Sequence, residues 1–356
     1  MRTDDRDRGE PRADWQYMAS ADWNDLDLVR GRLAAGADPN GPLHPSGYGT
    51  PLSEAAGSGS PEVVATLAAL VRDVDADNGE GQTALWAAVC GRRAENAAAL
   101  LAAGADAWRP IAGDWSPGRL ALLSPLASHF EHLPGAVPPP AEERAAAAEA
   151  DRFRGMLGDV DAEGLGIAFV AGIDEDETIR RLGASPERCP VLDLDDPPFP
   201  FCEPDEDEEE DDYLDPDDFC DLRFVGVTGV EGGCVVSQPW GFLPANHTVL
   251  GRLSAGTVAY GLYLNPKSGA QGMVARDGTL DHDWGLDIHP IEVGYLEPGG
   301  GNVLLRFLYS SCYAGDAVGY GCAYTGLRIS DRRAVTGPFR RWVQVPGWDE
   351  DGPAQR

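Results

Sequence analysis

Several patterns that mark common protein classes are missing from this sequence. Its seven cysteines are widely scattered among 356 residues and none forms a C-x-x-C pair, which favours reduced thiols over a disulfide framework. No stretch approaches the roughly 18 consecutive apolar residues that a membrane-spanning helix needs. The amino terminus alternates charges and has no apolar segment, so we expect no signal peptide. Together these absences predict a cytoplasmic protein without a membrane partner.

Basic residues are scarce relative to acidic ones. The chain has 28 Lys and Arg against 59 Asp and Glu, which gives a net charge of −31. A field of that sign repels the phosphates of nucleic acid and of anionic lipid, so we expect neither as a partner. It favours a basic protein partner instead. The hydrophobic fraction of 43% excludes a wholly disordered chain.

Catalytic motifs are also missing. The sequence contains no G-x-S-x-G nucleophile elbow and no Walker phosphate loop. The densest titratable cluster outside the acidic run is Asp281–His289. On a strand its aspartates would share a face with His289, while His282 would fall on the other. Because these residues do not converge as a known ligand motif does, we predict no enzyme, no cofactor and no metal.

The first hundred residues repeat themselves. Gly36-Ala37-Asp38 recurs as Gly104-Ala105-Asp106, with a weaker copy at Val71-Arg72-Asp73 between them. Thr50-Pro51-Leu52 recurs 33 residues later as Thr83-Ala84-Leu85. Each threonine is suited to cap the start of a helix, and each glycine to end one.

These motifs resemble the ankyrin repeat, which has a period of 33 residues and a T-P-L-H-x-A signature. The resemblance implies an all-α solenoid over residues 14–133, with three to four repeats and degenerate terminal ones. Its first helix would include Trp15, Tyr17 and Met18. The alternative interpretation of the same pattern is a generic alanine-rich array of helical hairpins, which would have almost the same fold. Either array offers a binding face with projecting tips but no chemistry of its own.

The second half of the chain has a different pattern. Short apolar runs separated by tight turns, including Asp277-Gly278, predict an α+β domain with a mainly antiparallel sheet. The pieces GIAFVAGIDEDETIRRLGA, CVVSQPWGFLP, RLSAGTVAYGLYLN and MVARDGTL, in that order, resemble an uncharacterised domain of actinobacterial proteins. That resemblance implies no activity.

The expected organisation is therefore multidomain. Residues 193–221 contain 16 acidic residues and no Lys or Arg, which predicts a solvated loop. The alternatives are an acidic segment that attracts a basic partner and a calcium site. The full set of expected segments is a disordered tail at 1–13, the repeats at 14–133, a proline linker at 134–140, a connecting helix at 141–163, the α+β domain at 164–335 and a second tail at 336–356.

We interpret the chain as a protein–protein interaction module that binds a basic partner through the repeat face, in a role such as immunity protein or antitoxin. The alternative is a small-ligand sensor or enzyme in the second domain, with a pocket lined by His282, Asp283 or His289. No oligomeric state follows from the sequence. The predicted partner-binding residues lie on the tips and beside the Ala-Ala pairs: Glu80, Gln82, Trp108, Arg109, Ser46, Ser58 and Val89. For Trp108 the alternative is a cap on the solenoid core.

Overall fold

Helix α8 (Ala141–Leu157) contains the boundary between two units of the chain in the computed structural model, between Ala147 and Ala148. The structure describes residues 12–43, 47–111, 114–158, 164–193, 223–265, 269–281, 315–346, 348–349 and 352–353. Most of the acidic run 193–221, and the cluster from His282 to His289, lie outside these residues.

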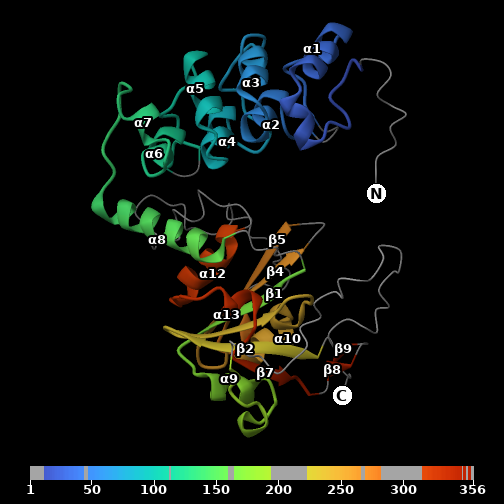
Figure 1. Cartoon of the computed structure of the whole chain (residues 1–356), viewed down its shortest axis with the longest axis vertical. Helices are drawn as coiled ribbons and strands as arrows, with labels where there is room; N and C mark the ends of the chain where they lie inside the picture. The colour runs from blue at the N-terminus through green and yellow to red at the C-terminus, as the bar shows by residue number, and fades with distance from the viewer. Residues whose placement is uncertain are drawn as a thin grey trace. The chain divides into compact units, whose positions relative to one another are not determined.

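The N-terminal unit is an array of short antiparallel helix pairs (Figure 1). The first members of successive pairs pack against one another in one row, and the second members of the first three pairs pack in another row. The elements are η2 (Ser20–Asn24), α1 (Leu26–Ala35), α2 (Pro51–Ser58), α3 (Pro61–Ala68), α4 (Ala84–Cys90), α5 (Ala94–Ala102), α6 (Pro117–Ala121) and α7 (Ala127–Phe130). The predicted all-α solenoid is confirmed.

Local sequence signals place these helices as expected. The hydroxyl of Thr50 accepts a hydrogen bond from the backbone N–H of Ser53 at 3.1 Å, and Thr83 caps α4 through the N–H of Trp86 at 3.3 Å. Each bond satisfies an amide that has no partner within the first turn. Gly36 ends α1 with a φ of 107°, a conformation that costs glycine little.

The first repeat differs from the expectation. Trp15, Tyr17 and Met18 precede the first helix, which is η2, and the residue that fills the core from η2 is Trp23. Trp23 is 1% exposed, and its ring stacks on that of Trp15 with centroids 5.6 Å apart. Trp15 and Trp23 therefore cover the end of the array, and the residues before η2 do not form a further helical turn.

Side chains also join one repeat to the next. The side-chain oxygen of Asn40 accepts a hydrogen bond from the backbone N–H of Arg72 at 2.9 Å. One repeat later, both carboxylate oxygens of Asp75 accept from the N–H of Asp106, at 3.1 and 3.0 Å. We call these two contacts the inter-repeat rungs.

The C-terminal unit contains a seven-stranded sheet in the order β6-β5-β4-β1-β3-β2-β7, with every neighbouring pair antiparallel. Asp277 and Gly278, with φ of 49° and 83°, form the predicted tight turn between β5 and β6. The strands are β1 (Gly166–Ala171), β2 (Phe224–Val230), β3 (Gly233–Gln238), β4 (Val258–Asn265), β5 (Gly269–Arg276), β6 (Thr279–Leu280) and β7 (Arg341–Gln344), and a separate ribbon pairs β8 (Trp348–Asp349) with β9 (Gly352–Pro353).

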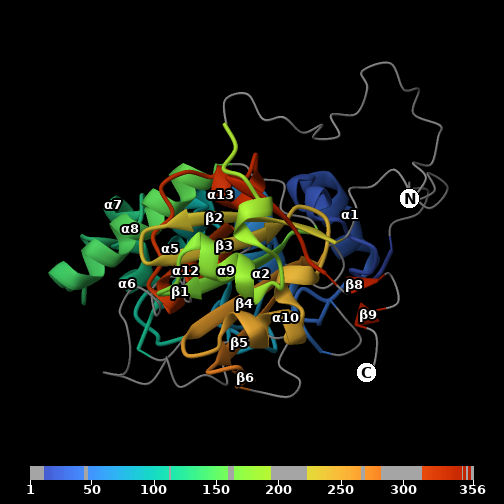
Figure 2. The same cartoon turned by 90° about the horizontal axis from the view of Figure 1, so that it is seen from below.

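Helices cover both faces of the sheet (Figures 1 and 2). Because side chains alternate along a strand, Ala168 and Val170 face the core beneath α9 and α10, while Phe169 faces α12. Gly321 permits that contact, since a Cβ there would lie 2.4 Å from the Phe169 ring. The helices are α9 (Glu175–Arg181), α10 (His247–Leu253), α12 (Gly315–Thr325) and α13 (Arg333–Thr336), with short turns η3 (Pro186–Arg188) and η5 (Leu243–Ala245).

The predicted tail at 336–356 is wrong in its first part. β7 pairs with β2 along its length, from Phe224 opposite Gln344 to Val227 opposite Arg341. The side chain of Val343 is fully buried in the hydrophobic core of the unit. A four-residue strand with polar ends has little local signal, and its stability comes from pairing with a distant strand.

Candidate protein-binding surface

The second repeat tip is shaped by two polar side chains. The side-chain oxygen of Asn78 accepts hydrogen bonds from the backbone N–H groups of Glu80 and Gln82, at 3.0 and 3.2 Å. Asp77 accepts from the two glycines of the same loop, at 2.6 and 3.1 Å. These bonds fix the backbone, so the exposed side chain of Glu80 and the half-buried one of Gln82 start from defined positions.

The first tip lies against the second. The backbone N–H of Gly49 donates to the carbonyl of Asn78 at 2.7 Å. Tyr48 is 50% exposed, and a Cβ placed on Gly79 would lie 3.4 Å from its ring atom Cδ1. Sequence reasoning missed Tyr48, although a signal was present: an aromatic residue between two glycines of a tip, where Gly47 and Gly49 both adopt positive φ.

Trp108 and Arg109 occupy the third tip in different ways. The Trp108 indole N–H donates to the carbonyl of Pro134 at 2.8 Å, and its ring packs against Gly118 and Gly135. This half-buried packing favours the alternative that Trp108 caps the array over direct contact with a partner. Arg109 is exposed, and its guanidinium donates to the backbone carbonyl of Asp75 at 2.6 Å.

Three predicted residues remain. Val89 is 2% exposed and packs in the core, so its prediction as a partner-binding residue is wrong: its position on α4 turns it inward. Ser58 is half-buried, and its hydroxyl donates to the carbonyl of Glu54 at 2.9 Å. Ser46 lies outside the described residues.

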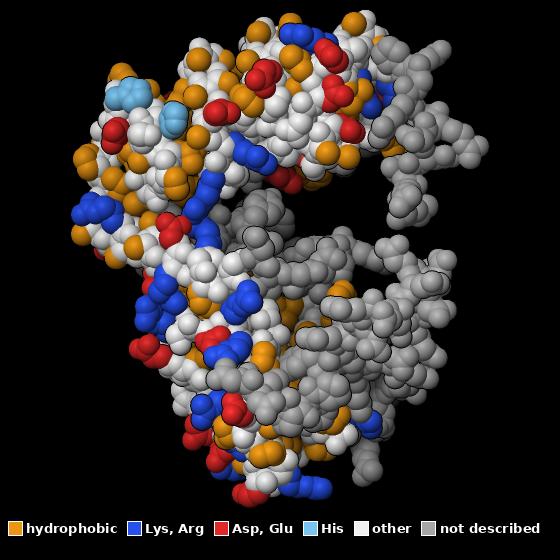
Figure 3. Space-filling view, viewed as in Figure 1, with side chains coloured by type: hydrophobic (Ala, Val, Ile, Leu, Met, Phe, Trp, Pro, Cys, Tyr) orange, Lys and Arg blue, Asp and Glu red, His pale blue; other side chains and the backbone are white. Residues whose placement is uncertain are grey.

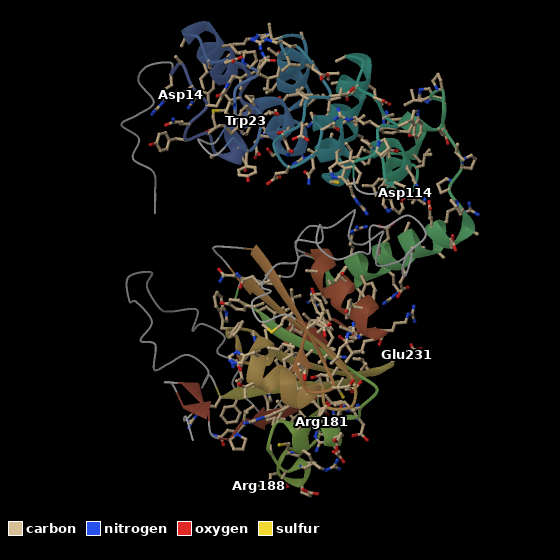
Figure 4. All side chains as sticks on the ribbon, turned by 180° about the vertical axis from the view of Figure 1, so that it is seen from behind. Asp14, Trp23, Asp114, Arg181, Arg188 and Glu231 are labelled. Atoms are coloured by element: carbon tan, nitrogen blue, oxygen red, sulfur yellow. The ribbon has the colours of Figure 1, made fainter. Side chains whose placement is uncertain are left out.

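Most acidic side chains of the tips have no cationic partner. Within the part of the chain that the structure describes, the carboxylates of Asp73, Asp77, Glu80 and Asp106 form no ion pair, whereas Asp114 pairs with Arg119 at 2.6 Å near the end of the array opposite Trp23 (Figure 4). Burial, helped by the charges of Asp73 and Asp106, raises the pKa of Asp75. We call the exposed side chains of Tyr48, Asp73, Asp77, Glu80, Asp106 and Arg109 the tip surface.

The C-terminal unit is different, because many of its acidic side chains are paired. Figure 3 shows red and blue side chains next to one another over its visible, described part. Glu177 pairs with Arg181 at 2.8 Å, and Asp331 pairs with Arg333 at 2.6 Å. The tip surface therefore gathers several carboxylates that form no ion pair with the described residues.

A hollow of about 750 Å³ in the C-terminal unit lies between the loop that leads into α9, the β2–β3 turn and the start of β7. Glu175 in its wall accepts a hydrogen bond from the N–H of Gly229 at 2.7 Å and forms an ion pair with Arg340 at 2.9 Å. Arg341 is 7% exposed, donates to the carbonyls of Pro186 and Cys189, each at 2.6 Å, and pairs with Asp176.

The polar groups of this hollow are thus satisfied by one another, and this arrangement indicates a structural network rather than a reactive site. Among the described residues no group of three or more His, Cys, Asp and Glu side chains is placed to hold a metal ion. The pocket predicted around His282, Asp283 and His289 lies outside those residues.

Comparison with known proteins identifies the first unit. Residues 17–110 match the family model for ankyrin repeats, in three copies. A search of curated proteins finds no match to the chain. The N-terminal region is therefore an ankyrin-repeat array, which as a class serves protein–protein interaction and carries no enzymatic chemistry. No helix among the described residues is both long enough and apolar enough to cross a membrane.

Proposed function

We propose that this chain recognises a basic protein through the tip surface of its ankyrin array. The uncompensated acidic charge of that surface is the observation that carries the proposal. Several carboxylates of the C-terminal unit have their own cations instead, and Glu149 at its start pairs with both Arg152 and Arg328. A carboxylate without an internal partner attracts an external cation and, across an interface, favours association with a positively charged surface.

The helices of the array support the same assignment. Many of their apolar side chains pack in the core of the array, as the buried residues Leu52, Leu85 and Val89 do. The tips, by contrast, present polar and acidic side chains to the solvent, among them Asp73, Asp77 and Glu80. Ankyrin arrays bind through surfaces of this kind because rigid helix pairs hold the tips in fixed positions.

A concrete form of this function is an immunity or antitoxin-like role, in which the chain sequesters a basic toxin such as a nuclease. The net charge of −31 supports it, since a strongly acidic protein associates quickly with a basic one and competes with the phosphates that such a toxin binds. The alternative of a ligand site or enzyme in the C-terminal unit depends on His282 and His289, and it stays a prediction.

The test exchanges two tip charges without altering net charge. The variant Glu80→Lys with Arg109→Glu is compared with a matched control, Glu95→Lys with Arg30→Glu, in which both side chains are exposed on the second helices of their repeats. A partner is first isolated from lysate on immobilised wild-type protein, identified, purified and titrated by calorimetry. We expect the tip variant to lose affinity by about tenfold or more, and the control to bind as wild type does.

Circular dichroism and melting temperature are measured for both variants. We expect both to stay nearly unchanged, because exposed charges contribute little to stability. If the purified partner bound the tip variant as tightly as the wild type, the tip surface would not be its site. The binding function would then pass to the C-terminal unit.

A further inference from the structure

We infer that Tyr48 is the specificity-determining residue of the tip surface, and that it takes an arginine side chain of the basic partner between its ring and the carboxylate of Glu80. This inference rests on the proposed function. It deepens that function by naming an arginine-bearing segment, rather than a diffuse basic surface, as the bound element.

The position of Tyr48 is the first support. Its backbone is held between two tips by the hydrogen bond from Gly49 to Asn78, at 2.7 Å. Gly79 has no side chain to cover the ring, and a Cβ there would lie 3.4 Å from Cδ1. Half of the tyrosine side chain stays exposed, although the surrounding backbone is fixed. An aromatic side chain on a fixed backbone has only two torsions to order and loses little conformational entropy on binding, which is why tyrosine is favoured in binding surfaces.

The charge of the loop that approaches the ring through Gly79 is the second support. Glu80 belongs to the same loop as Gly79, and its backbone N–H is fixed by Asn78 at 3.0 Å. Its carboxylate forms no ion pair with the described residues and is exposed. Asp77, on the same loop, adds a second negative charge. A cation above the Tyr48 ring therefore gains both the attraction of the ring face and a carboxylate partner.

Arginine fits this pair of groups better than lysine. Its guanidinium is planar and stacks on an aromatic ring while its N–H groups still reach a carboxylate at its edge. A lysine ammonium is more strongly hydrated and has no flat face to stack. The two cations bear the same charge, so a preference for arginine separates the Tyr48 contact from the general acidic field of the chain.

The probe is a fluorescein-labelled hexa-arginine peptide, with a hexa-lysine peptide of equal charge as its comparison. Binding of each to the full chain is measured by fluorescence anisotropy near physiological salt. The quantity of interest is the ratio of the two affinities, because attraction by the acidic run at 193–221 acts on both peptides. We expect the wild type to prefer hexa-arginine by about two- to fivefold, because an exposed cation–π contact sets the upper limit of the difference.

Two variants of Tyr48 decide whether that preference comes from the ring. Tyr48→Ala should bring the ratio close to one, whereas Tyr48→Phe, which keeps the ring, should retain it. Glu80→Gln should weaken hexa-arginine binding more than Glu95→Gln, a control with the same change of charge on an exposed helix position. Hydrogen exchange should show protection of the 47–50 and 77–83 backbone by hexa-arginine in the wild type and its loss in Tyr48→Ala.

The outcomes separate this inference from the proposed function. If the ratio is unchanged in Tyr48→Ala while both peptides protect the two tips, the arginine site is refuted and the acidic tip surface stands. If neither peptide protects the tips, the arginine site is refuted as well. The proposed function itself falls only if the variant with Glu80→Lys and Arg109→Glu also keeps its partner.

Discussion

Replacing the buried Arg341 tests which interactions stabilise the edge of the C-terminal sheet that β7 forms. Arg341 begins β7, and its guanidinium donates to the carbonyls of Pro186 and Cys189, each at 2.6 Å, and to the carboxylate of Asp176. The two carbonyls belong to the turn after α9, so one side chain ties that turn to the edge strand. We expect the carbonyl contacts, rather than the ion pair, to carry most of the stability.

The structure sets the size of the effect. A hydrogen bond from a charged donor contributes about 1.5–3 kcal/mol, so losing two would cost about 3–6 kcal/mol. Water that enters after truncation lowers this range, and we expect Arg341→Ala to reduce the free energy of unfolding by about 3–5 kcal/mol. Arg341→Lys, which cannot reach both carbonyls, should fall between. Asp176 is 51% exposed, so Asp176→Asn should cost less than about 1 kcal/mol.

The assay must read the C-terminal unit alone, because the two units need not unfold together. Urea denaturation followed by amide hydrogen exchange in peptides from β2 and β7 gives a local free energy for this edge. The expected order of destabilisation is Arg341→Ala, then Arg341→Lys, then Asp176→Asn. An Asp176→Asn variant as unstable as Arg341→Ala would refute the reasoning and transfer the stabilisation to the ion pair.

Three further changes have expected outcomes. Because the pKa of Asp75 is raised above its usual value of 3.8, this group favours the folded state below about pH 4 and loses that contribution as pH rises through its folded pKa. Asp75→Asn keeps an oxygen acceptor, as Asn40 does, and should raise the melting temperature at pH 7 but not at pH 3. Gly118→Ala places a Cβ 2.4 Å from the Trp108 ring and should cost about 1–3 kcal/mol in denaturant titrations. Trp108→Phe removes the bond to Pro134 and should lower stability by about 1 kcal/mol while leaving affinity for the purified partner unchanged.

Much of the N-terminal fold was predictable because its determinants are local. Thr50, Thr83 and Gly36 act on backbone groups within one helical turn, and each does so in the structure as expected. The failures concern properties that depend on the fold. Val89 was assigned to the surface although α4 turns it inward, and the burial of a side chain on a seven-residue helix follows from what packs around it.

The C-terminal unit shows the same division. The turn at Asp277-Gly278 and the cap at Asp174, which accepts the N–H of Glu177 at 2.8 Å, are visible in the sequence. β7 is not, because its pairing with β2 joins segments far apart in the chain. For Tyr48 the flanking glycines are a local signal of a tip, but the approach of Gly79 from the next repeat to its ring is not visible in any local pattern.

The inter-repeat rungs have a consequence for how the array can grow. Asn40 and Asp75 each offer an acceptor to the following repeat, whereas the matching place in the third repeat holds Trp108, which donates to Pro134 and fills the space above Gly118. A duplicated unit inserted between the first two rungs would have the side-chain acceptor of Asn40 on one side and a backbone N–H donor of the next repeat on the other. The helix pair α6 and α7 follows Trp108, and α6 packs on α4 without a further acceptor of this kind at that position. The series of rungs therefore ends one helix pair before the array does, and a unit inserted after Trp108 would have to pack against an indole.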